Sequence, residues 1–161
     1  MTSVPSGSGA RRHRQATVAI RGALRELSVQ LSLLNRQVGA RLELKDVDLD
    51  CLDLINAHGP LTPSALARRT GLHPATMTGI LDRLERGGWI SRDRDPSDRR
   101  AVRISTRRDR NAELLGLFAG MNTSLEHICA GYEDADLELV ADFLGRAAEA
   151  GRIAAESLTA E

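Results

Sequence analysis

The sequence predicts a mainly α-helical fold with one small β-hairpin. Its core must be aliphatic, because 42% of the 161 residues are hydrophobic and the only aromatic rings are Trp89, Phe118, Tyr132 and Phe143. An aliphatic core favours helix packing over a β-sandwich. Apolar residues recur at helical spacing near both ends of the chain, whereas an alternating pattern is confined to residues 89–105. The length fits a single domain.

The N-terminal part predicts a short leader and one long helix. Residues 1–10 are small and polar, with proline and glycine among them, and we expect them to be disordered. Residues 11–45 are expected to contain the helix, whose periodicity is clear from about Thr17. The predicted apolar stripe steps by three and four residues and comprises Ile20, Leu24, Leu27, Leu31, Leu34 and Val38.

Three shorter helices are predicted next, over about 46–57, 63–70 and 74–86. The first ends at a His-Gly-Pro sequence, which stops a helix. Thr62 is a suitable N-cap for the second, and a proline follows it at the first helical position. Gly71 is a suitable C-terminal glycine. Two short helices joined by a tight turn that contains glycine are the signature of a helix-turn-helix.

The apolar period changes after these helices. Residues 89–92 resemble a strand, residues 93–100 form a polar loop, and residues 101–105 alternate as a returning strand. A hairpin that directly follows a helix-turn-helix is a wing. We therefore predict a winged helix-turn-helix domain over residues 46–106.

The remaining residues, 107–161, predict two long helices over about 107–130 and 134–157. Both contain apolar stripes, made by Leu114, Leu117, Phe118, Met121, Leu125 and Ile128 in the first, and by Leu137, Val140, Leu144, Ala147, Ala154 and Leu158 in the second. A small central domain cannot bury apolar stripes at both chain ends, so we predict that residues 11–45 and 107–161 are N- and C-terminal dimerisation helices. A monomeric helical bundle is the alternative.

Charge is distributed unevenly along a chain whose net charge is zero. Residues 1–61 have eight basic and six acidic side chains, residues 62–110 have twelve and six, and residues 111–161 have two and ten. The central segment therefore has a charge of +6 and the last segment −8. This asymmetry indicates an anionic partner for the central segment.

Several classes of protein are excluded by the residue inventory. Two cysteines cannot form a disulfide framework, no apolar run approaches the roughly 18 residues of a membrane span, and the N-terminus lacks the apolar part of a signal peptide. We therefore expect a cytoplasmic protein without a membrane partner. The sequence contains no glycine-rich phosphate loop, nucleophile motif or metal-binding spacing of cysteine and histidine, so we expect no enzyme activity, cofactor or metal.

Three segments in register resemble the MarR family of bacterial transcriptional regulators. They are GPLTPSALARRTGL at 59–72, TMTGILDRLERGGWI at 76–90 and DPSDRRAV at 95–102. The resemblance covers about 50 residues closely and the order of elements over nearly the whole chain. One departure lies after the wing, where Arg108 takes the place of a usual glycine.

The resemblance implies a homodimeric DNA-binding transcriptional regulator, more often a repressor, on a pseudo-palindromic double-stranded operator. The helix over 74–86 would enter the major groove and the wing over 93–100 the minor groove. A small-molecule effector would release the DNA. A winged-helix module that binds protein instead of DNA is an alternative, but the twelve arginines of residues 62–110 argue against it.

Candidate DNA contacts follow from this arrangement. Ser64 and Arg68 would hold the phosphate backbone from the preceding helix. Small residues would let the next helix approach the bases closely: Ala75, Thr76, Thr78 and Gly79. Thr76 and Thr78 suit either bases or phosphates.

Two further candidates have alternative roles. His73 suits either a phosphate or a helix cap. Arg83 suits either a phosphate or an ion pair with an acidic neighbour such as Asp82 or Glu85.

In the wing, the resemblance points to Asp98, Arg99 and Arg100. Asp98 and Arg100 match an Asp-x-Arg feature that recurs in the family. By this resemblance Arg100 enters the minor groove, whose negative potential is strongest over narrow A·T tracts. Asp98 would accept hydrogen bonds and orient the loop, because phosphates repel a carboxylate.

The effector is less defined by the sequence. The resemblance implies a cleft that draws on the first two helices, where Arg21, Arg25 or His58 would meet an anionic, phenolic-type molecule; a surface or capping role is the alternative for each. A cysteine-based redox sensor is a further alternative, with Cys51 and Cys129 as its thiols. The family's redox sensors usually place the reactive cysteine in the first helix, and this sequence has none there.

Overall fold

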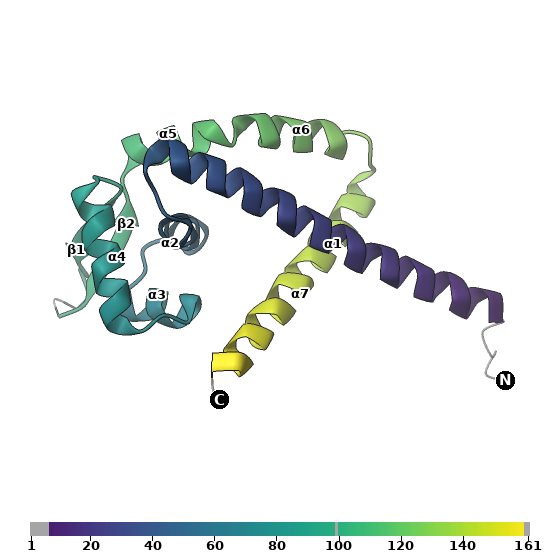
Figure 1. Ribbon diagram of the computed structural model, residues 1–161, viewed down its shortest axis with the longest axis horizontal. Coiled ribbons are helices and arrows are strands. Elements are labelled where there is room, and N and C mark those ends of the chain that lie inside the picture. Colours follow the sequence, from purple (N-terminus) through teal and green to yellow (C-terminus); the bar gives the residue numbers. More distant parts are fainter. Residues whose placement is uncertain (1–6, 99, 160–161) are drawn as a thin grey trace. The chain divides into compact units, whose positions relative to one another are not determined.

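The structure is a computed structural model that describes residues 7–98 and 100–159 (Figure 1). Within these residues the chain is mostly helical, and its two strands form one antiparallel hairpin. The elements, in order, are α1 (Gly7–Leu42), α2 (Asp46–His58), α3 (Pro63–Thr70), α4 (Pro74–Arg86), β1 (Ile90–Arg94), β2 (Val102–Thr106), α5 (Arg108–Leu117), α6 (Ala119–Cys129) and α7 (Asp134–Thr159). The mainly helical winged helix-turn-helix fold is confirmed.

The chain divides into two compact units, residues 1–46 and 47–161. The first contains α1, which begins at Gly7, ten residues before the periodicity that predicted it. Residues 7–10 therefore belong to the helix and not to a leader, and the rest of the predicted leader lies outside the described residues. The small residues of this first turn, including Ser8 and Ala10, extend α1 without adding to its apolar stripe.

The second unit contains an aliphatic core built by α2, α3, α4 and the hairpin. Its side chains are almost inaccessible to solvent, and those with the least exposure include Leu49, Leu52, Leu66, Leu81, Leu84 and Ile104. These residues lie at helical spacing on the three helices and on one face of β2. The predicted bounds of α3 and α4 are confirmed, and α2 extends one residue beyond its predicted end.

The hairpin pairs Ile90 with Thr106 and Arg94 with Val102. A third segment, which the sequence did not predict, joins this sheet at one residue. The backbones of Leu61 and Ile104 exchange two hydrogen bonds, with N···O distances of 3.1 and 2.8 Å. The chain just before α3 is thereby attached to the wing.

Trp89 lies at the junction of α4 and β1 and is 4% exposed. The guanidinium of Arg110 lies 3.9 Å from the centre of its ring, within the range of a cation–π contact. A Cβ atom placed on Gly87 would lie 2.8 Å from the ring. Glycine is therefore required at position 87 by the close approach of this ring.

The C-terminal part departs from prediction at one point. A single helix was predicted over 107–130, but it is interrupted at Phe118, between α5 and α6. Gly116 and Gly120 flank the interruption, and glycine is a poor helix former. The long final helix, α7, is confirmed.

Helices α6 and α7 expose much of their apolar surface. No residue of α6 is buried. The large exposed apolar side chains of the two helices are Met121, Leu125, Ile128, Leu139, Val140, Phe143, Leu144, Ile153 and Leu158. An amphipathic helix normally packs its apolar face against another element. Among the described residues, none of the helices has the length and apolar character needed to span a bilayer.

Candidate nucleic-acid interface

Local capping interactions set the directions of α3 and α4. The Oγ1 atom of Thr62 accepts a hydrogen bond from the amide of Ala65 at 3.2 Å, as expected for an N-cap. Gly71 has φ = 68°, in the left-handed region that glycine adopts without strain. Its amide bonds back to the carbonyl of Ala67, which ends α3. The chain can then turn at once into α4, as the helix-turn-helix signature predicted.

Helix α4 has one buried face and one exposed face. Met77, Ile80, Leu81 and Leu84 are buried in the core. The four small residues predicted to meet DNA are all exposed: Ala75, Thr76, Thr78 and Gly79. A continuous surface of small side chains therefore covers the first two turns of α4.

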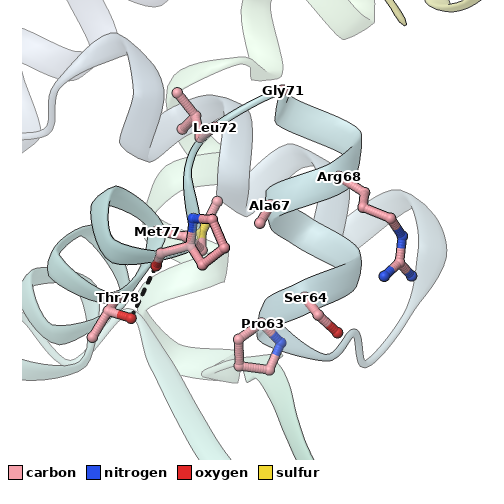
Figure 2. Close-up of a pocket in the computed structure, with 9 residues that line it drawn as sticks. Pro63, Ser64, Ala67, Arg68, Gly71, Leu72, Met77 and Thr78 are labelled. Carbon is pink, nitrogen blue, oxygen red and sulfur yellow. Dashed lines mark hydrogen bonds between the residues drawn. The ribbon is translucent and has the colours of Figure 1, made fainter. Parts of the chain in front are cut away.

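A groove with a volume of about 650 Å³ runs between α3 and α4 (Figure 2). Ser64 and Arg68 line it from α3, and Thr78 lines it from α4. The structure therefore brings three of the predicted DNA contacts to one groove. The Ser64 hydroxyl lies 3.1 Å from the Thr62 hydroxyl.

His73 forms a helix cap, which was one of its two predicted roles. Its Nδ1 atom accepts a hydrogen bond from the amide of Ala75 at 3.2 Å. In the neutral ring an accepting Nδ1 leaves the proton on Nε2, which can still donate to an acceptor outside the helix. The ring is exposed.

Arg83 has a structural partner that the sequence did not indicate. Its Nη2 and Nε atoms donate to the two carboxylate oxygens of Asp48 on α2, at 2.5 and 3.2 Å. The Asp48 side chain is 0% exposed and that of Arg83 is 36% exposed. This pair replaces the predicted one with Asp82 or Glu85, and the predicted phosphate contact stays a prediction. No sequence spacing predicts a contact between residues 35 positions apart.

The hairpin loop is organised by Asp95, a residue that the sequence analysis missed. Its carboxylate accepts hydrogen bonds from the Ser97 amide and hydroxyl, at 2.7 and 2.6 Å, and forms an ion pair with Arg103. The side chain is 7% exposed. The Asp-Pro-Ser sequence at the start of the turn could have predicted this role, because an Asp side chain often accepts a hydrogen bond from the backbone amide two residues later.

Asp98 accepts a hydrogen bond from the backbone amide of Arg100 at 3.0 Å, in agreement with its predicted role in orienting the loop. Arg100 is exposed, and its side chain has no ion pair with any described residue. Arg99, the third predicted contact of the wing, lies outside the described residues.

The carboxyl of Asp95 makes the stability of the fold depend on pH. Hydrogen bonds from the Ser97 side chain, from Arg103 and from the Ser97 amide hold the pKa of Asp95 well below its ordinary value. A carboxyl whose pKa is lower in the folded chain stabilises the fold at neutral pH, and this stabilisation is lost as the pH falls below the ordinary carboxyl range. We therefore expect wild-type stability to decrease more steeply with acid than that of Asp95→Asn.

Urea unfolding at a series of pH values between about 3 and 7 measures this difference. Asp142→Asn is the matched control, because Asp142 is exposed and its partner Arg146 is also exposed. Parallel pH profiles for the wild type and Asp95→Asn would contradict the role assigned to Asp95.

Ion pairing determines which arginines remain available to an anion. Arg83, Arg92, Arg103, Arg107 and Arg110 all lie within 4.0 Å of a carboxylate oxygen. Within the described part of the segment 62–110, exposed arginines without an ion pair include Arg68, Arg94 and Arg100. These lie on α3, at the end of β1 and in the loop of the hairpin. The sequence could count the charges but could not separate these two groups.

The predicted effector residues belong to different compact units of the chain, residues 1–46 and 47–161. Arg21 and Arg25 lie one turn apart on α1 and are exposed. His58 ends α2, and its Nε2 atom lies 3.3 Å from Nη1 of Arg69 on α3. Their role toward an effector therefore stays a prediction.

The two cysteines differ in burial. Cys51 on α2 is 0% exposed, and burial, with the neighbouring charges of Asp48 and Asp50, raises its thiol pKa to about 11. Such a group is protonated at neutral pH and is a poor nucleophile. Cys129, at the end of α6, is partly exposed. Cys51 therefore lacks the thiolate character of a redox sensor.

Known proteins resemble this chain over the helix-turn-helix and the hairpin just described. The model of the MarR family matches residues 44–102, which span the helix-turn-helix and most of the hairpin. A Bacillus subtilis protein described as the uncharacterized HTH-type transcriptional regulator YcgE is 34% identical over 125 residues, 78% of this chain and 81% of its own length. The chain belongs to the MarR family.

Solved structures show the same fold at lower identity. A mutant of MepR from Staphylococcus aureus superposes on this chain with a TM-score of 0.70 at 16% identity. The match covers 81% of this chain and 96% of the MepR chain. Another MepR mutant, bound to an oligodeoxyribonucleotide, has a TM-score of 0.54 at 19% identity over 81% and 96% of the two chains. The MarR-family chain is accordingly an HTH-type transcriptional regulator, a class of proteins that are not enzymes.

Proposed function

We propose that the protein binds a pseudo-palindromic operator as a homodimer in the bacterial cytoplasm and acts as a repressor. Helix α4 enters the major groove, and the loop between β1 and β2 follows the minor groove. The observation that supports this most directly is the exposed small-residue surface of α4, with Arg68 on the other side of the same groove. Small side chains permit close approach to base edges, and an arginine beside them suits a phosphate.

The proposed contact of each side chain with DNA follows from the hydrogen bonds and ion pairs that it forms within the fold. Arg68 binds a phosphate from α3, beside the Ser64 hydroxyl. His73 uses its Nδ1 atom as a cap and donates from Nε2 to a phosphate. Arg100 reaches the minor groove from a turn that Asp98 orients. Arg83 holds α4 against α2 through Asp48.

The prediction for DNA binding is a strong dependence on salt. Arg68, Arg94 and Arg100 would bring six positive charges to the operator in a dimer, at the backbone or in the minor groove, and each would displace counterions from the DNA. We therefore expect operator affinity to fall about a thousandfold between about 50 and 200 mM salt. The measurement is a gel shift on DNA from the intergenic region upstream of its own gene and on duplexes selected from a randomised pool.

Two variants separate the outcomes of this titration. Arg68→Ala should lower both the affinity and the salt slope. Arg152→Ala should change neither, because Arg152 already forms ion pairs with Glu149 and Glu156 on α7. Weak binding without sequence preference and without a salt slope would favour the alternative winged-helix module that binds protein.

The homodimer is supported by the apolar surface that α6 and α7 leave exposed. Two copies that bury these faces would place their α4 helices on successive half-sites, about one helical turn of DNA apart. We expect a solution mass of twice 17.5 kDa. Sedimentation equilibrium measures it, and Leu125→Glu should shift the mass toward the monomer. A monomer in the wild type would overturn the dimer.

A small anionic, phenolic-type molecule is the proposed effector, with Arg21, Arg25 and His58 as candidate contacts. A hydroxybenzoate serves as the probe. We expect it to release the gel-shift complex at millimolar concentration from the wild type and less readily from His58→Ala. Release without any difference among alanine variants of these three residues would place the effector elsewhere.

A further inference from the structure

The first two turns of α4 contain none of the side chains that usually read bases by paired hydrogen bonds. Over residues 74–81 the helix contains no arginine, lysine, asparagine, glutamine or acidic residue. The next polar residue, Asp82, forms an ion pair with Arg92 at 2.6 Å. Guanine and adenine are usually read by bidentate contacts from such long side chains. Base recognition by these two turns therefore depends on short side chains, which are Ala75, Thr76 and Thr78.

Thr78 is exposed, and the proton of its hydroxyl is bonded within α4. The Oγ1 atom donates a hydrogen bond to the carbonyl oxygen of Pro74, one turn earlier, at 3.0 Å. Figure 2 shows this bond as the dashed line that begins at Thr78. A hydroxyl that donates within the helix cannot also donate to a phosphate or to a base acceptor. Its exposed apolar group remains for a contact.

Gly79 provides independent support, because nothing within the fold requires glycine there. A Cβ atom at this position would meet no atom within 4 Å. Glycine in a helix interior costs about 1 kcal/mol relative to alanine. The residue is exposed and adjoins Thr78 on the surface of α4. Its lack of a side chain is useful only if another surface comes close to the helix backbone.

We propose that Thr78 recognises the C5-methyl group of thymine in the major groove, and that Gly79 gives the base edge room to reach the helix. This inference rests on the proposed function and adds to it the base that the helix reads. Thymine alone presents a methyl group in the major groove, and an apolar contact with it distinguishes A·T from the other pairs. Ala75 adds a second exposed methyl group at the start of the same surface.

The decisive experiment removes the methyl group from the DNA. A duplex selected from a randomised pool is synthesised once with thymine and once with deoxyuridine at each thymine, and wild-type affinity is measured for both. The base pairs and the minor groove are unchanged, so contacts of Arg100 are retained. We expect binding to weaken about fourfold for each contacted methyl that is removed. Single replacements then locate the contacted positions.

Matched variants of Thr78 test the protein side of the contact. Thr78→Val keeps an outward methyl and removes the hydroxyl, and it should bind nearly as tightly as the wild type. Thr78→Ser keeps the hydroxyl and removes the methyl, and it should bind weakly and become insensitive to deoxyuridine at the contacted position. The opposite order of these two variants would overturn the inference in favour of a hydrogen bond from the hydroxyl.

Gly79→Ala separates binding from folding. The added methyl has space in the free protein, so the urea midpoint should not decrease, whereas operator affinity should fall at least tenfold. Unchanged affinity would overturn the proposed close approach.

Different results would overturn the thymine contact and the proposed DNA-binding function. Salt-dependent, sequence-specific binding that ignores deoxyuridine would overturn only the thymine contact. Absence of specific binding to any duplex would overturn the proposed function and, with it, this inference.

Discussion

Arg83→Met is expected to lower the free energy of unfolding by about 3 kcal/mol, the largest effect of any single charge in the described helix-turn-helix. Methionine keeps the apolar stem of the side chain and removes the guanidinium that binds Asp48. The carboxylate of Asp48 is 0% exposed, so it cannot exchange this partner for bulk water. Urea unfolding followed through the fluorescence of Trp89, the only tryptophan, measures the loss.

The two halves of this pair should behave differently. Arg83 is 36% exposed and can turn to solvent when its partner is removed, so Asp48→Asn should cost less than Arg83→Met. Arg86→Met is the matched control, because Arg86 lies on the same helix, is exposed and donates to the backbone carbonyl of Asp82. Equal losses for the variants of Arg83 and Arg86 would contradict the role assigned to the buried pair.

The double variant Asp48→Leu/Arg83→Met gives a further test. Replacing a buried ion pair with apolar residues of similar size is often neutral, so we expect most of the lost stability to return. Operator affinity should remain lower than in the wild type, because the ion pair also sets the position of α4 relative to α2. Full recovery of both quantities would show that the pair has no positioning role.

Arg100→Ala is expected to weaken operator binding by about fivefold to 150-fold, the range for a contact worth about 1–3 kcal/mol. Arg100 is exposed and forms no ion pair with any described residue. The turn that contains it is restrained by Asp98 and, directly after the end of β1, by Asp95. Its guanidinium can therefore enter the minor groove without first breaking an internal contact. Fluorescence anisotropy with a labelled operator measures the change.

Arg152→Ala should leave the affinity unchanged, because its guanidinium lies between two carboxylates of α7. A change in the DNA shows whether Arg100 enters the minor groove or contacts only the phosphates. Exchanging A·T for G·C pairs at the flanks of the operator should weaken the wild type and leave Arg100→Ala unaffected, because narrow A·T minor grooves attract arginine. Equal sensitivity of both proteins would assign Arg100 to the phosphates.

The local elements of the DNA-facing domain were predictable because their signals are local. Thr62, Gly71 and His73 act within a few residues of the helix ends that they define. The alternation after Gly88 sufficed to predict the hairpin to within two residues. The break at Phe118 was missed because an apolar stripe runs across it, and two glycines weaken the helix without changing the pattern.

The sequence predicted which residues line the candidate interface. It did not predict which of their charged side chains lack an ion pair within the fold. Ala75, Thr76, Thr78 and Gly79 share one exposed surface, which follows from helical spacing. The pairing of Arg83 with Asp48 and of Arg103 with Asp95 joins positions that no local rule connects. Which arginines remain for a phosphate is a result of those pairs.

By itself, the sequence determined the order of the helices, the position of the wing, the concentration of positive charge in residues 62–110 and the resemblance to the MarR family. These properties depend on periodicity, capping and charge, which act over a few residues. Only the tertiary structure decided that Asp48 is buried against Arg83, that Leu61 joins the hairpin and that the Thr78 hydroxyl is turned into its own helix. Each of these depends on which atoms meet when the chain folds, and burial then sets the energy of the contact.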